Sequence, residues 1–108
     1  MGKTVNEMLD EREKTYGSFK GHALIAQKLK ETMQDSPKWH SLTYDKKEAL
    51  EMIQHKVARV LNGDPEYDDN WRDIAGYATL VENTLKPVCK ENYLTKKSLK
   101  PNYAEVGC

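Results

Sequence analysis

The sequence predicts an all-α fold, a bundle of about four helices, and three observations support this prediction. Apolar residues recur three and four positions apart in several segments, which is the spacing of one face of a helix. Residues that favour helix starts precede these segments, and glycine or proline follows them. No segment of useful length alternates between apolar and polar residues, so we expect no strands.

The first two helices have clear boundaries in the sequence. Thr4-Val5-Asn6-Glu7 has the pattern of a capping box that opens the first helix. This helix should end near Tyr16-Gly17, because glycine readily adopts the left-handed backbone that ends many helices. Ser18 is a good N-cap for the second helix, and Asp35-Ser36-Pro37 should end it.

The third and fourth helices are expected to be antiparallel neighbours. Thr43 is a good N-cap for the third helix, and Asn62-Gly63 should end it. Asp64-Pro65 should open the fourth, with proline at its first position. A connection this short places consecutive helices side by side. The apolar stripes expected to be buried are Leu50, Ile53, Val57 and Val60 in the third helix, and Trp71, Ile74, Ala78, Val81 and Leu85 in the fourth.

The helical pattern stops at Pro87. We therefore divide the chain into a helical domain, residues 1–86, and a polar C-terminal tail or arm, residues 87–108. Cys89 and Cys108 lie in the tail. Their spacing allows a disulfide, but a reduced pair is the favoured interpretation for a cytosolic chain.

Composition excludes some functions and favours others. Lys and Arg together number 17, as do Asp and Glu, so the chain has no overall basic field for nucleic acid. Apolar runs are far too short for a membrane span, and the N-terminal residues lack a signal-peptide pattern, so we expect a cytoplasmic protein. A chain of 108 residues buries only a modest core, which favours a homo-oligomer, a dimer or higher.

A polar cluster on the last two helices is the first candidate site. Lys56 is expected to face Asp73, and Arg59 to approach Asp69 across the short turn. One interpretation is a set of structural salt bridges, and the other is a phosphate site. Three carboxylates fall within the segment from Asp68 to Asp73, and oxygen ligands clustered in this way suit Mg²⁺.

The end of the first helix is the second candidate. The ordinary interpretation of Arg12, Lys14, Tyr16 and Gly17-Ser18 is a charged helix end, a glycine cap and a serine N-cap. The functional one uses the same residues, because a helix N-terminus attracts phosphate and the Tyr16 ring could stack on a base. No hydrolase nucleophile motif is present, so any reaction would be metal-assisted. His22 and His40 are expected at the surface.

Three stretches carry a resemblance to known proteins. They are Tyr16-Gly17-Ser18-Phe19, Lys56-Val57-Ala58-Arg59 and the run from Asp69 to Ala78, DNWRDIAGYA. Together they resemble a small, largely uncharacterised family common in bacteriophage genomes. More distantly, they resemble the all-α MazG-like nucleoside triphosphate pyrophosphatases. The resemblance covers roughly Val5 to Leu85.

The resemblance implies a chemistry and a set of residues. MazG-like enzymes hold Mg²⁺ with E-E-x-x-E and E-x-x-D motifs on adjacent helices, and release monophosphate and pyrophosphate. Asp73 matches the Asp of the second motif, Asn70 falls at its Glu position, and Asp69 lies alongside. Glu48 and Glu51 give a partial first motif. The positions expected to face Asp73 are cations instead, and cations would bind phosphate and oppose a metal.

Three hypotheses follow. The first is a Mg²⁺-dependent pyrophosphohydrolase, with the metal and catalysis carried by Glu48, Glu51, Asp69 and Asp73. The second is a nucleotide-sequestering protein that counters host defence signalling in the host cytoplasm. Its phosphate clamp would be Arg12, Lys56 and Arg59, with Tyr16 or Tyr77 stacking on the base. The third is a helical protein-interaction module in which the charge cluster is structural.

Overall fold

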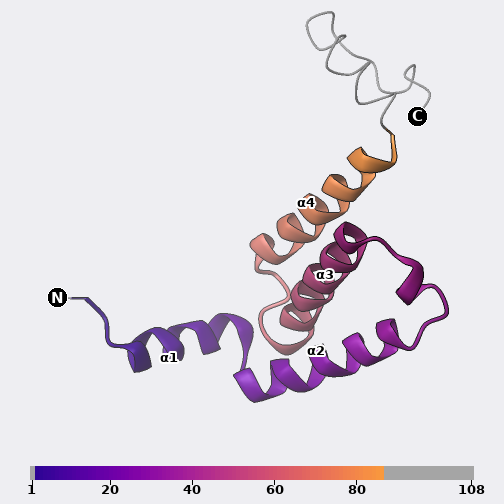
Figure 1. Cartoon of the computed structure of the whole chain (residues 1–108). Helices are drawn as coiled ribbons and strands as arrows, with labels where there is room; N and C mark the ends of the chain where they lie inside the picture. The colour runs from indigo at the N-terminus through magenta and orange to yellow at the C-terminus, as the bar shows by residue number, and fades with distance from the viewer. Residues whose placement is uncertain (1, 87–108) are drawn as a thin grey trace, which may run out of the picture.

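The computed structural model describes residues 2–86 and confirms an all-helical fold with no strand in that range (Figure 1). The tail predicted at residues 87–108, with Cys89 and Cys108, lies outside the described residues. The elements are α1 (Val5–Tyr16), α2 (Phe19–Gln34), the short 3₁₀ helix η1 (Trp39–Ser41), α3 (Tyr44–Asn62) and α4 (Asp68–Leu85). None of these helices is both long and apolar enough to cross a membrane.

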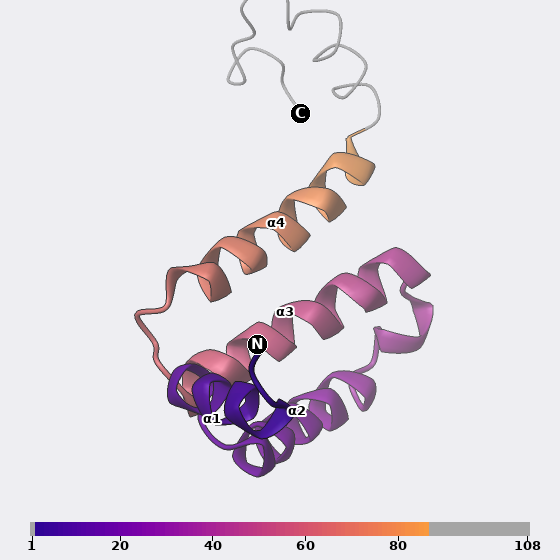
Figure 2. The ribbon, with the colours of Figure 1, turned by 90° about the vertical axis from the view of Figure 1, so that its left-hand side faces the viewer.

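Helix α3 is the centre of the arrangement. It packs against α2 on one side and against α4 on the other (Figures 1 and 2). The chain runs along α3 and returns along α4 in the opposite direction, as the sequence predicts. Helix α1 projects away from this group, and residues 5 to 14 are all exposed.

The predicted starts of the first two helices are confirmed. The Thr4 hydroxyl accepts a hydrogen bond from the Glu7 N–H at 3.1 Å, and the Glu7 carboxylate accepts one from the Thr4 N–H at 2.8 Å. Ser18 Oγ accepts from the Gly21 N–H at 3.1 Å, which caps α2. Gly17 lies between these helices at φ 78°, a conformation that favours glycine.

The start of α3 after Thr43 is as predicted, whereas the hydrogen bond of Thr43 and the start of α4 differ. Thr43 precedes α3, but its hydroxyl donates to the Asp45 carboxylate instead of capping a backbone N–H. Helix α4 begins at Asp68, not at Pro65. The chain first makes a turn in which the Asp64 carboxylate accepts from the Glu66 N–H at 2.9 Å, so the connection is longer than expected.

The predicted core of α4 is wrong in part. Trp71 is 54% exposed, whereas its neighbour Asn70 is 1% exposed. The helix is rotated so that Asn70, the residue before Trp71, points into the interior. The Trp71 indole N–H donates to the Pro65 carbonyl at 2.9 Å, which holds the ring against the connecting loop.

The apolar core of the described residues is small. Its buried side chains are Ala26, Trp39, Ala49 and Ala58. Three of these are alanines, so little apolar area leaves water within one chain. The exposed large apolar side chains include Val5, Met8 and Leu9 on α1, Phe19 and Leu24 on α2, Leu50 and Leu61 on α3, and Trp71, Leu80 and Leu85 on α4.

A close backbone contact joins the α1–α2 turn to the end of α3. The Asn62 side-chain amide donates to the Tyr16 and Ser18 carbonyls, each at 2.8 Å. The Asp64 N–H donates to the Thr15 carbonyl at 2.8 Å. A Cβ atom on Gly63 would lie 2.3 Å from that same carbonyl oxygen, so only glycine fits here without a shift of the backbone.

We predict opposite effects for two glycine-to-alanine changes. Gly63→Ala should lower the free energy of unfolding by about 1–3 kcal/mol, because the added methyl group overlaps rigid backbone. Gly76→Ala should raise it by about 0.5–1 kcal/mol, because Gly76 lies within α4 with open space around it and alanine favours a helix. Urea unfolding monitored by circular dichroism measures both.

Each variant has an outcome that contradicts this account. A Gly63→Ala protein as stable as the parent would mean that the α1–α2 turn does not pack on α3 as described. A destabilised Gly76→Ala protein would mean that another group approaches the helix backbone at this glycine, contrary to the open space described.

Candidate functional site

The expected approach of Lys56 to Asp73 is present and links α3 to α4. Lys56 Nζ lies 2.9 Å from Asp73 Oδ2. The Lys56 side chain is only 12% exposed, so its charge needs this partner, whereas the Asp73 side chain is 44% exposed. The pair neutralises one cation and one carboxylate of the predicted site.

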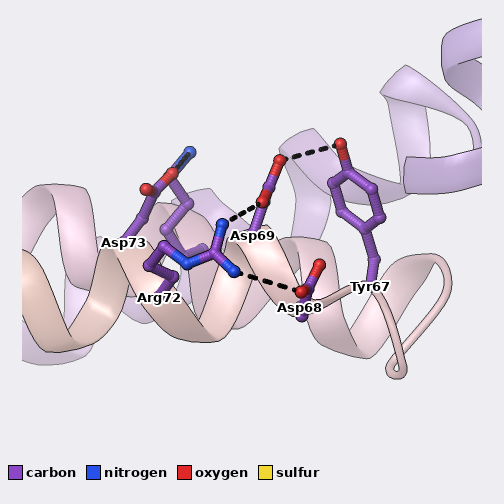
Figure 3. A network of polar contacts seen from close by, with 6 residues as sticks. Tyr67, Asp68, Asp69, Arg72 and Asp73 are labelled. Carbon is purple, nitrogen blue, oxygen red and sulfur yellow. Dashed lines mark hydrogen bonds and ion pairs between the residues drawn. The ribbon is translucent and has the colours of Figure 1, made fainter.

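The expected approach of Arg59 to Asp69 is absent. Asp69 Oδ1 lies 3.0 Å from Arg72 Nη1, and its other oxygen accepts from the Tyr67 hydroxyl at 3.1 Å (Figure 3). Arg72 also pairs with Asp68 at 3.2 Å. Because α4 starts at Asp68, these carboxylates lie in its first turn and pair with an arginine one turn further on.

Arg59 stacks instead on the tyrosine that ends α1. Its guanidinium carbon lies 4.1 Å from the centroid of the Tyr16 ring, and that of Arg12 lies 5.0 Å from the same centroid. Tyr67 contacts Tyr16 edge-on, with 5.8 Å between ring centroids. We call Arg12, Tyr16, Arg59 and Tyr67 the tyrosine–arginine cluster. Among residues 2–86 neither Arg12 nor Arg59 has an ion-pair partner.

Tyr67 is held as a neutral phenol. Its hydroxyl donates to the Asp69 carboxylate, and this bond together with the neighbouring Tyr16 raises the pKa of Tyr67 to about 12. The phenol therefore keeps its proton at every physiological pH.

Two histidines form a second feature beside the cluster. The rings of His22, on α2, and His55, on α3, meet edge-on with centroids 4.6 Å apart. His22 is 9% exposed and its Nδ1 atom has no hydrogen-bond partner, so the expectation of a surface position is wrong. The sequence contained one indication that His22 is buried, because His22 precedes Ala26, which is buried, by four residues on the same helix face.

Burial and nearby cations keep this histidine pair neutral. Burial lowers the pKa of His55 to about 4, with further lowering by Arg59, His22, Lys56 and Lys30. Burial and then Arg59 also lower the pKa of His22. The pair therefore lies in a region of positive potential between α2 and α3.

The residues predicted to hold Mg²⁺ are not gathered in one place. Lys56 is level with Asp73, while Glu51 and Glu48 lie five and eight residues before Lys56, about 7.5 Å and 12 Å along the helix axis. Within residues 2–86 no group of three or more His, Cys, Asp or Glu side chains is placed to hold a metal ion. This donor set therefore does not fit Mg²⁺ within one chain. The catalytic role of these carboxylates stays a prediction.

The remaining predicted site residues have varied surroundings. Asn70 is enclosed, and its Nδ2 atom has no hydrogen-bond partner. Tyr77 is half-buried, one turn after Asp73, and Lys14 is exposed in the last turn of α1. A Cβ on Gly17 would lie 2.1 Å from the Asn62 carbonyl, so Gly17 serves the contact with α3.

Residues 2–85 match DUF6378, a domain of unknown function. The chain belongs to the DUF6378 family. No curated protein and no solved structure matches it. The tyrosine–arginine cluster, the histidine pair and the Lys56–Asp73 ion pair all lie within the part of the chain that matches DUF6378.

We predict that this DUF6378 domain loses stability in mild acid partly through its histidine pair. Below about pH 6.5 the histidines are protonated in the unfolded chain, whereas His55 in the folded chain stays neutral down to about pH 4, its pKa there. The free energy of unfolding therefore falls as the pH is lowered from about 6.5 to about 4. His55→Gln should reduce this loss. Urea midpoints measured between pH 4.5 and 8, about the range in which histidine titrates, test this.

The exposed His40 provides the matched control for this prediction. His40→Gln should leave the pH dependence of the parent unchanged. An equal pH dependence in the parent and in His55→Gln would show that the loss of stability comes from other groups.

Proposed function

We propose that this DUF6378 domain binds a phosphate-bearing nucleotide at the tyrosine–arginine cluster. The observation that supports this most strongly is the placement of two guanidinium groups against one tyrosine ring, without a carboxylate partner in residues 2–86. Each guanidinium carries its charge over the ring with no carboxylate to offset it, so an anion bound beside either one would be stabilised. The planar guanidinium matches phosphate oxygens with two parallel hydrogen bonds.

The cluster also has the chemistry to hold a base. Tyrosine rings and guanidinium planes both stack on nucleobases, and such stacking tolerates different bases. Tyr67, fixed by Asp69, gives the cluster a second ring at a defined angle. The net charge of the whole chain is zero, so this site would act locally and not through a general basic surface.

We favour binding without turnover. The carboxylates that a MazG-like enzyme would use are here neutralised, Asp69 by Arg72 and Asp73 by Lys56. A phage protein that sequesters a nucleotide of host defence signalling, in the host cytoplasm, fits this chemistry. A distant relation to MazG-like proteins belongs to the same proposal.

We also propose that the domain works as a homo-oligomer. The exposed large apolar side chains lie on all four α-helices, while the buried apolar ones are few and small. A second copy would cover part of this surface and supply the core that one chain lacks.

The nucleotide site is tested by replacing Arg59. Arg59→Ala should weaken nucleotide binding at least about tenfold, since a charge-assisted bond contributes about 1.5–3 kcal/mol. Arg59→Lys should restore little of it, because an ammonium group cannot reproduce the planar contacts. Thermal shift with a panel of nucleoside mono-, di- and triphosphates identifies a ligand, and calorimetry measures its affinity.

Lys86→Ala is the control, because Lys86 is a cation that directly follows α4 and pairs with Glu82, at the opposite end of that helix from Tyr67. A stable Arg59→Ala protein that binds every nucleotide as the parent does would refute the site. The panel is also run with Mg²⁺. If the parent cleaves a nucleoside triphosphate to monophosphate and pyrophosphate, and a folded Asp73→Asn protein does not, the domain is an enzyme and the sequestration proposal is refuted.

Association is tested on the exposed face of α4. Sedimentation velocity at tens of micromolar, roughly the range in which weak dimers form, should show a dimer or larger species. Leu80→Glu should shift the protein toward monomer, because Leu80 is 63% exposed and its burial would stabilise the contact. Thr79→Glu places the same charge on a polar exposed position about 100° away around the same helix and should change little. A monomeric parent would contradict the proposal.

A further inference from the structure

The histidine pair has features that a purely structural contact does not explain. His22 is more than nine-tenths buried, and its Nδ1 atom neither donates nor accepts a hydrogen bond in the described residues. A buried polar atom without a partner costs free energy, roughly 1–3 kcal/mol. Such atoms are often explained by a ligand or a proton that completes the site.

The surroundings of the pair are cationic on more than one side. Lys30 lies nearby on α2, and Lys56 and Arg59 lie nearby on α3. From α4 the Asp73 carboxylate pairs with Lys56. From α1 the neutral Tyr16 ring covers Arg59. Lys30 and Arg59 therefore have no ion-pair partner in residues 2–86, whereas Lys56 has one.

We propose that His22 and His55 form the floor of the nucleotide site, where a multiply charged terminal phosphate binds together with a proton. This inference rests on the proposed function and extends it. Arg59 joins the two features, because it stacks on Tyr16 and lies one turn after His55 on α3, where His22 meets His55.

The physical reason is the balance of charge before and after binding. Without an anion, burial and Arg59 lower the pKa of both imidazoles, and Lys56 and Lys30 lower that of His55 further, so both rings are neutral. A phosphate at this position offsets the cations and accepts a hydrogen bond from imidazolium, so it favours the protonated ring. Proton and anion therefore bind cooperatively, and each raises the affinity for the other by the same factor. A terminal phosphate, with up to two charges, uses such a site better than a singly charged diester.

The probe for this inference is inorganic sulfate, an anion that does not itself titrate between pH 4 and 8, about the window of histidine. The imidazole signals of the full chain are followed by NMR against pH in sodium sulfate and in sodium chloride at equal ionic strength. We expect sulfate to raise the pKa of His55, and that of His22, by about one to two units. The imidazole signals of the exposed His40 are the internal reference and should depend on pH in the same way in both salts.

Two variants distinguish specific anion binding at this site from general screening of charges by the salt. Arg59→Gln should abolish the sulfate effect, while Lys86→Gln, in an ion pair at the C-terminal end of α4, should leave it intact. Equal titration of all histidines in the two salts would overturn the inference, and this outcome uses the parent protein alone.

The nucleotide panel at pH 8, where the pair is neutral, makes the two proposals separable. If nucleotides bind through Arg59 but sulfate leaves the pKa values of His22 and His55 unchanged, the histidine inference is refuted and the proposed function is supported. If sulfate raises these pKa values but no nucleotide binds, the anion site is supported and its assignment to nucleotides is refuted.

Discussion

The rest of the structure depends on the contact between the α1–α2 turn and the C-terminal end of α3. Asn62 holds two carbonyl groups of that turn, and the Asp64 N–H holds a third. The two segments come so close that a Cβ atom at position 17 or 63 would overlap backbone of the other segment, which is why glycine occupies both positions. It fixes where α1 ends, and with it the position of Tyr16.

The candidate site follows from this constraint. Tyr16 is the last residue of α1, and Arg59 lies one turn before the end of α3, so the contact brings the ring and the guanidinium together. The same packing of α2 on α3 places His22 against His55. Two pairs of residues from distant parts of the sequence thus meet around Arg59. By contrast, the carboxylates at the start of α4 are satisfied within their own helix.

The weak apolar interior gives a second theme. Small side chains at positions 26, 49 and 58 let the helices approach closely, but they bury little area. Polar side chains occupy interior positions that apolar ones would ordinarily fill, with Asn70 and Gln54 as examples beside His22. A single chain organised in this way exposes the apolar surface on which we base the proposal of self-association.

The sequence by itself determined the helices and most of their ends. Capping residues act through hydrogen bonds to near neighbours in the chain, and glycine acts through its own backbone freedom, so both signals are local. It also indicated that Lys56 faces Asp73, since helical spacing and antiparallel packing suffice for that. Only the tertiary structure decided the rotation of α4, which buried Asn70 and exposed Trp71. Only the tertiary structure brought Arg59 to Tyr16 and His22 to His55, because such contacts depend on how separate helices dock, and periodicity along one helix carries no information about docking.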